Sequence, residues 1–115
     1  MHLTIRHTTH YRYDTPGMTA VQRLRLTPPN NRAQRVLEWR IEAPGIASAP
    51  TYVDGFGNIV HLITTEIAGD ALAITAAGTV ETTDCGGVAG LGPEVASPKI
   101  FLRETALTRP GAAIE

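Results

Sequence analysis

The chain has 115 residues, of which 43% are hydrophobic and 18% are charged, and its formal net charge is −1. This length suits one domain with a single core rather than two domains. Charged and polar residues interrupt the first apolar run, so we expect neither a signal peptide nor a membrane-spanning segment, and no membrane partner. The single cysteine, Cys85, has no partner for an internal disulfide, and we therefore expect a cytoplasmic protein.

Alternation of apolar and polar side chains predicts a series of short strands separated by glycine- and proline-rich turns. The runs cover residues 2–14, 21–28, 34–43, 48–54, 59–66 and 71–83. In the third run Leu37, Trp39 and Ile41 share one face, and Trp39 is expected to anchor the core. The run 59–66 is apolar on both faces, which is typical of a central strand. Gly78 is expected to mark a bend or bulge in the last run.

These runs predict an all-β fold, an antiparallel β-sandwich of the immunoglobulin-like or a related type with about six or seven strands. We expect the sandwich core to occupy residues 1–84. Residues 85–98 are rich in glycine and proline and are predicted to form a loop or linker. Residues 99–115 have too few apolar side chains for a second core, and we expect them to be a tail that leads into another domain.

Cys85 lacks the surroundings of a catalytic nucleophile. Its neighbour Asp84 is acidic, which disfavours the thiolate, and no amphipathic helix follows it. The glycine-rich stretch 87–92 superficially resembles a phosphate-binding loop, but the proline-bounded residues that follow are too few for the necessary helix. The P-loop lysine is also missing. We therefore interpret this stretch as linker and expect no catalytic residue in the chain.

The histidine pattern does not predict a metal site. His7 and His10 are three residues apart on one strand and point to opposite faces, whereas His2 and His10 share a face but lie far apart. His7 and His61 would meet if their strands pair. Asp54 and Asn58 flank a glycine-rich turn with too few ligands for calcium, and a hairpin turn explains them. We expect no metal and no other cofactor.

Charge is distributed unevenly along the chain. Residues 1–40 hold seven arginines against Asp14 and Glu38, and the later residues are acidic in balance. The outward residues of the first two strands could form one basic row that touches a polyanion; they are Arg6, His10, Arg12, Arg23 and Arg25. Single-stranded nucleic acid also requires aromatic rings on that face, and Tyr11 and Tyr13 lie on the opposite one. We favour a solvated strand face and expect no nucleic-acid partner.

Four stretches resemble the N-terminal region of bacterial transglutaminase-like proteins, a family of cysteine-protease type. They are His7-Thr-Thr-His-Tyr-Arg-Tyr-Asp14, Leu24-Arg-Leu-Thr-Pro28, Asp54-Gly-Phe-Gly-Asn-Ile-Val-His61 and Val80-Glu-Thr-Thr-Asp84. Phe101-Leu102 and Leu107-Thr108 also fit the segment where that region joins the next domain. The resemblance implies a β-sandwich followed by a papain-like catalytic domain with a Cys-His-Asp set. No position here matches the catalytic cysteine motif, so no catalytic residue is carried over.

The resemblance implies a non-catalytic accessory domain, structural or docking in role, whose partner is the downstream papain-like catalytic domain of the same polypeptide. That domain would act on a protein or peptide substrate by thiolate attack, with histidine as the base, beyond Glu115. One alternative is a free-standing module that binds an extended peptide on an edge strand or a polyanion on the arginine face. Another is a small metal-dependent enzyme, which requires contact between His7 and His61.

Overall fold

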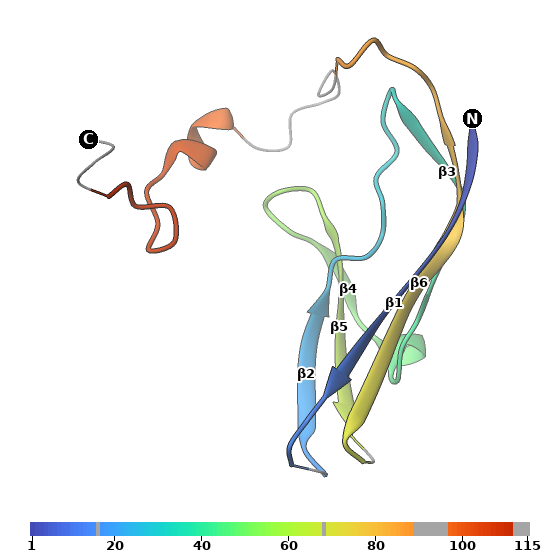
Figure 1. Ribbon diagram of the computed structural model, residues 1–115, viewed down its shortest axis with the longest axis vertical. Coiled ribbons are helices and arrows are strands. Elements are labelled where there is room, and N and C mark those ends of the chain that lie inside the picture. The colour runs from blue at the N-terminus through green and yellow to red at the C-terminus, as the bar shows by residue number, and fades with distance from the viewer. Residues whose placement is uncertain (16, 68, 89–96, 112–115) are drawn as a thin grey trace.

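The computed structural model describes residues 1–15, 17–67, 69–88 and 97–111. These residues contain six strands, arranged in two three-stranded antiparallel sheets with the orders β1-β6-β3 and β2-β5-β4 (Figure 1). The strands are β1 (His2–Arg12), β2 (Thr19–Leu24), β3 (Gln34–Glu42), β4 (Thr51–Val53), β5 (Ile59–Glu66) and β6 (Ala71–Thr82), and two 3-10 helices are η1 (Ile46–Ser48) and η2 (Pro98–Leu102). The predicted all-β antiparallel fold is confirmed. Neither described helix is long and apolar enough to span a membrane.

The two sheets are joined at one end by a pair of connections that cross between them side by side (Figure 1). One connection leads from β1 to β2 and the other from β5 to β6. Their backbones are hydrogen-bonded to each other: Tyr13 N donates to Asp70 O at 2.7 Å, and Ile67 N donates to Met18 O at 2.9 Å. Because each connection satisfies the polar backbone groups of the other, this end of the sandwich is closed.

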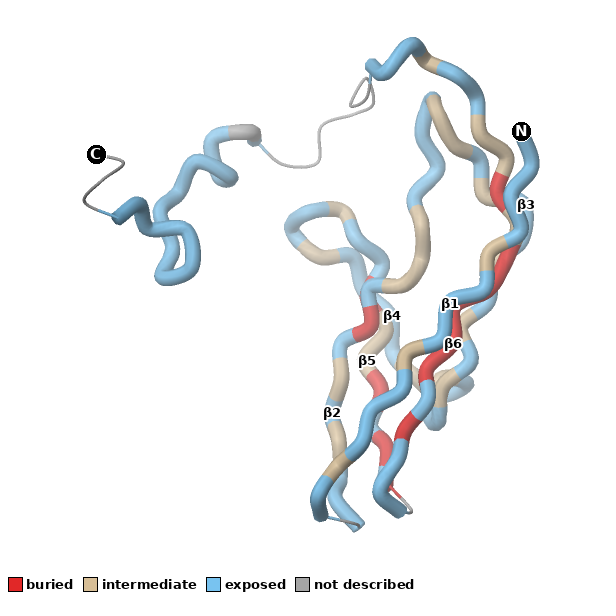
Figure 2. Tube along the Cα trace, in the orientation of Figure 1, coloured by how far each residue is buried: buried red, intermediate tan, exposed pale blue. Residues whose placement is uncertain are grey.

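The core lies between the sheets near the closed end. Leu24 and Ile63 from one sheet pack against Leu72 and Ile74 from the other, and each of the four is at least nine-tenths buried. Figure 2 shows that the buried residues follow β6 and β5, the central strands of the two sheets. The edge strand β2 alternates between exposed residues and buried or partly buried ones, as a period-two strand with one covered face does, whereas β1 is mostly exposed and only its residues Ile5 and Thr9 are partly buried.

The third strand, β3, contains a β-bulge, and one of its side chains therefore faces the opposite way from the prediction. The register of β3 against β6 shifts between Val36 and Glu38, so the residue between them has no direct partner. As a result, Val36 is paired with the buried Val80, and Leu37 is 44% exposed rather than directed into the core. The prediction for Leu37 was wrong because an extra residue in one strand reverses the alternation on one side of it.

Two predicted strand boundaries also differ. The second strand ends at Leu24 rather than at Pro28, although Leu26 still packs against the core as expected. The predicted strand 48–54 is divided: its first residue ends η1, and the strand β4 covers only Thr51–Val53. Gly45 adopts a φ of 77° at the start of η1, which turns the chain before it becomes extended.

β5 is the central strand of its sheet, as predicted. Its outer face is covered unevenly: Val60 is completely buried, whereas Thr64 is exposed. On the inner face the hydroxyl of Thr65 donates to Pro44 O at 2.9 Å, which satisfies a polar group inside the sandwich. The central position therefore gives β5 apolar cover along most of the inner face and part of the outer face.

Gly78 gives the sharpest test of this packing. A Cβ at residue 78 would lie 2.6 Å from Cε3 and 2.9 Å from Cα of Trp39, its partner in β3. We expect Gly78→Ala to lower the free energy of unfolding by about 3 kcal/mol, the upper end for an overpacked core. Urea denaturation followed by tryptophan fluorescence measures this change.

Gly55→Ala is the matched control, because nothing lies within 4 Å of a Cβ at that position. Its effect should stay within about 0.5 kcal/mol. Equal effects of the two substitutions would contradict the close approach of Trp39 to β6.

Candidate docking surface

Beyond the sandwich the described chain continues as a tail, residues 97–111, which is rich in exposed apolar side chains. It begins with η2, where the hydroxyl of Ser97 accepts a hydrogen bond from Lys99 N. Phe101 is 67% exposed, Leu102 85% and Leu107 98%. In Figure 1 this segment lies outside the two sheets, beyond the tip of the β4–β5 hairpin. Large apolar side chains gathered on one projecting segment are typical of a surface that a partner covers.

The tail meets the sandwich at an aromatic contact. The rings of Phe56 and Phe101 have centroids 5.7 Å apart and planes tilted by 41°, within the range of favourable aromatic pairs. Phe56 lies in the turn between β4 and β5, and Phe101 lies in η2. The contact therefore joins two segments that are 45 residues apart in sequence.

The turn that carries Phe56 is organised by the carboxylate of Asp54. One carboxylate oxygen, Oδ1, accepts hydrogen bonds from the backbone N–H of Phe56 at 2.9 Å and of Asn58 at 3.0 Å. The other, Oδ2, accepts from Arg25 Nε at 2.8 Å, and the Asn58 amide reaches both oxygens. Gly57 takes a φ of 80°, which favours glycine. This pattern confirms the interpretation of Asp54 and Asn58 as a hairpin turn.

Electrostatics favour the charged form of Asp54. The Arg25 guanidinium holds the pKa of the Asp54 carboxyl well below its usual range, with hydrogen bonds from Asn58 and Phe56 acting in the same direction against the cost of desolvation. The side chain of Asp54 is 11% exposed and that of Arg25 is 45% exposed. Since Arg25 follows β2 and Asp54 follows β4, the pair links the two edge strands of one sheet.

Cys85 lies just after β6, where its thiol donates to Arg32 O at 3.7 Å. It is partly buried, and the described contacts bring no histidine to its sulfur. Gly86 N donates to the carboxylate of Asp84 at 2.8 Å, so the local order is that of a turn. Of the glycine-rich stretch 87–92, residues 89–92 lie outside the described residues, as do 93–96 of the predicted linker.

The histidines are distributed over separate parts of the fold. His7 and His61 lie on strands of different sheets that do not pair, and the ring of His7 contacts the Thr9 hydroxyl at 3.3 Å. His61 lines a cavity of about 410 Å³ between the sheets, together with Trp39 and Ile41. Within the described residues, no three His, Cys, Asp or Glu side chains come together as a metal site.

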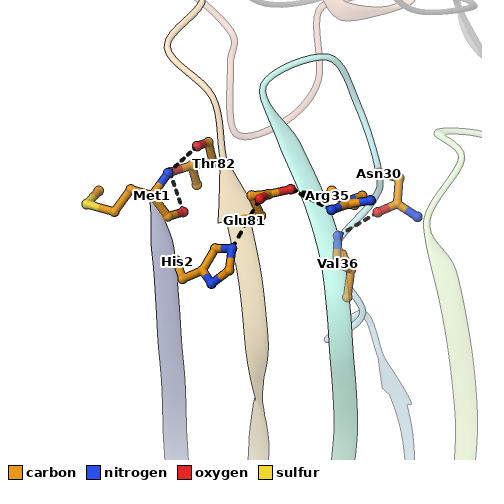
Figure 3. Close-up of polar contacts among 7 residues, drawn as sticks. All are labelled: Met1, His2, Asn30, Arg35, Val36, Glu81 and Thr82. Atoms are coloured by element: carbon orange, nitrogen blue, oxygen red, sulfur yellow. Dashed lines mark hydrogen bonds and ion pairs between the residues drawn. The ribbon is translucent and has the colours of Figure 1, made fainter.

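His2 belongs to a polar cluster at the open end of the β1-β6-β3 sheet. Figure 3 shows Glu81 between His2 and Arg35, with Nε2 of His2 at 3.1 Å and NH2 of Arg35 at 2.8 Å from its carboxylate. The hydrogen bond with His2 is the largest single effect that lowers the pKa of Glu81, and Arg35 lowers it further through a hydrogen bond and its charge. The amino group of Met1 donates to Thr82 O at 2.6 Å. These contacts tie the three strands of the sheet together where no second sheet faces them.

The basic row predicted from Arg6, His10, Arg12, Arg23 and Arg25 is not one surface. Arg6, His10 and Arg12 lie on β1 in the β1-β6-β3 sheet, whereas Arg23 lies on β2 in the other sheet and Arg25 directly follows β2. Because the outer faces of a sandwich point away from each other, the two groups face opposite directions. Arg6 is also paired with Glu42 at 3.3 Å, and Arg25 with Asp54. The arrangement argues against the alternative of one basic row and agrees with the favoured interpretation of solvated strand faces.

Sequence reasoning missed the Phe56–Phe101 contact and the Arg25–Asp54 ion pair. A weak signal was present for the first: an aromatic residue between two glycines of a hairpin turn has no role in forming that turn. The ion pair left no signal, since Arg25 and Asp54 are 29 residues apart and either could have been solvated. Trp39 is partly buried and lies outside the buried core cluster, so the predicted core anchor is not confirmed. Its indole N–H donates to Leu26 O at 2.7 Å, in the segment that follows β2.

The Asp54 network predicts how stability depends on pH. Because the folded-state pKa is lowered, the unfolded chain takes up the proton first as pH falls. The contribution of Asp54 is therefore complete above about pH 5 and declines as pH falls through about 4, the usual carboxyl pKa. We expect Asp54→Asn to reduce stability at pH 7 and to flatten the loss of stability between pH 5 and 2, measured by urea denaturation at each pH. The control is Glu66→Gln, which alters an exposed carboxylate at the end of β5 and should keep the wild-type dependence of stability on pH. If Asp54→Asn also kept that dependence, the Asp54 network would be contradicted.

Comparison with known proteins identifies the family. Residues 3–81 match the family model described as the bacterial transglutaminase-like N-terminal region. An uncharacterized protein of Mycobacterium leprae is 30% identical over 76 residues, which are 66% of this chain and 27% of that protein. The match thus spans about a quarter of the curated relative. No solved structure matches the chain. Since the family model covers well over half of the sequence, the chain belongs to the bacterial transglutaminase-like N-terminal region family.

Proposed function

We propose that this chain is a non-catalytic accessory domain that docks against a transglutaminase-like catalytic domain of the same polypeptide. The observation that carries the proposal is the exposed apolar tail, in which Phe101, Leu102 and Leu107 are each at least two-thirds exposed. Isolated, such a tail exposes three large apolar side chains to water within seven residues, which is typical of a segment that a partner covers. The family supports the same reading, because its name describes an N-terminal region.

In this proposal the chemistry belongs to the partner domain. A papain-like domain would attack an amide of a protein or peptide with a cysteine thiolate, with histidine as the base. Among the described residues we assign no reacting group. The Cys85 thiol donates a hydrogen bond to Arg32 O, and Arg40 is the one other charged side chain that lines the cavity of His61. Its role is to hold and orient the catalytic domain, in a cytoplasmic protein.

The size of the native protein tests the proposal directly. An antibody raised against this chain should detect a band well above 12.3 kDa in an immunoblot of the source cells, because the accessory domain would be part of a longer polypeptide. The control is the purified 115-residue chain on the same blot.

A native band at 12.3 kDa would overturn the proposal. It would favour the free-standing module, for which an extended peptide on an edge strand is the better ligand. A polyanion is the poorer one, because the arginines face opposite directions.

A further inference from the structure

The apex of the β4–β5 hairpin, residues 54–58, is rigid but displays an aromatic side chain. The backbone of Phe56 is fixed by its hydrogen bond to Asp54, and Gly57 N donates to Asp54 O at 3.0 Å. The Phe56 side chain is nevertheless 57% exposed. Such a ring contributes little to the core of the sandwich, and together with the exposed side chains of the tail it forms apolar surface that a partner could cover.

A cleft lies beside this ring. It has a volume of about 320 Å³ and separates the apex from the chain that follows β2; Thr27, Pro28, Pro29, Phe56 and Ile59 line it. This volume falls within the range of about 300–1,000 Å³ that is usual for sites holding a bound group. The two prolines have no N–H to offer, so their wall of the cleft is mainly apolar and suits an apolar side chain.

The tail reaches the sandwich at this same place. Phe101 rests against Phe56, and the residues that follow it lead away from both sheets (Figure 1). Leu102, next to Phe101, is 85% exposed. The apolar surface of Phe101 therefore adjoins that of Phe56 at the apex, next to the cleft that Phe56 lines.

We propose that the apex is the docking anchor of this domain: the transglutaminase-like domain of the same polypeptide packs on Phe56 and inserts an apolar side chain into the cleft. The Arg25–Asp54 ion pair acts as the positioning element, since it fixes the apex against β2. This inference rests on the proposed function, because it requires a longer parent protein.

The test uses the full-length parent protein and hydrogen–deuterium exchange. Phe56→Ala should raise exchange about two- to tenfold in residues 98–102 and in one surface of the transglutaminase-like domain, which corresponds to the loss of an aromatic anchor. Its thermal unfolding should match wild type, because Phe56 is exposed. Phe56→Tyr keeps the ring and should keep wild-type exchange. Val21→Ala removes a 65% exposed side chain from β2, away from the apex, and serves as the control.

Asp54→Asn separates positioning from contact. It leaves the Phe56 ring in place but weakens the ion pair that holds it, and it should therefore raise exchange in the same two regions by less than Phe56→Ala does. A full-length parent in which Phe56→Ala leaves both regions unchanged would overturn the docking anchor and leave the proposed function standing. A native protein of 12.3 kDa would overturn both.

Discussion

The approach of Trp39 to Gly78 is the constraint on which the sandwich depends. Trp39 lies opposite Gly78 in the β3–β6 pairing. Its atoms approach the backbone of Gly78 so closely that a side chain at residue 78 would clash with them. From there its indole reaches across the sandwich to Leu26 O, in the chain that leaves the other sheet. One residue thus combines apolar packing within a sheet with a hydrogen bond between sheets. The bulge that precedes it sets the direction of Trp39, because without the extra residue the alternation on β3 would be displaced by one position.

Much of the fold could be predicted from the alternation of apolar and polar residues. The order and type of the strands follow from it, and Gly78 was expected at an irregularity, although the extra residue proved to lie on the facing strand β3. The facing of Leu37 could not be predicted, since a bulge depends on the partner strand and leaves the local pattern unchanged. The short helix η1 could not be predicted either, because the three residues Ile46–Ser48 are too few to show a helical pattern of apolar residues.

The candidate site was less accessible to sequence reasoning, and the reason is distance along the chain. The hairpin turn around Asp54 is local, and the pattern of an acidic residue, two glycines and an asparagine predicts it. The partners that give it a role, Arg25 and Phe101, come from segments that the topology alone brings together. The arginines show the opposite case, in which residues that are near in sequence are separated by the fold. They look like one row in sequence, yet two sheets carry them on opposite sides of the sandwich.

The division between charged and apolar groups also indicates what kind of interface the domain offers. Five of its nine arginines form ion pairs within the described chain: Arg25 with Asp54, Arg35 with Glu81, Arg6 and Arg40 with Glu42, and Arg109 with Glu104. Exposed pairs of this kind are individually weak and are screened by salt, so they serve to order strand edges rather than to attract a distant partner. At the apex and along the tail, by contrast, the large apolar side chains of Phe56, Phe101, Leu102 and Leu107 are exposed. An interface built there derives its free energy from burying apolar area and its orientation from the ion pair behind Phe56. In the proposed docking, association through this surface should therefore depend little on ionic strength.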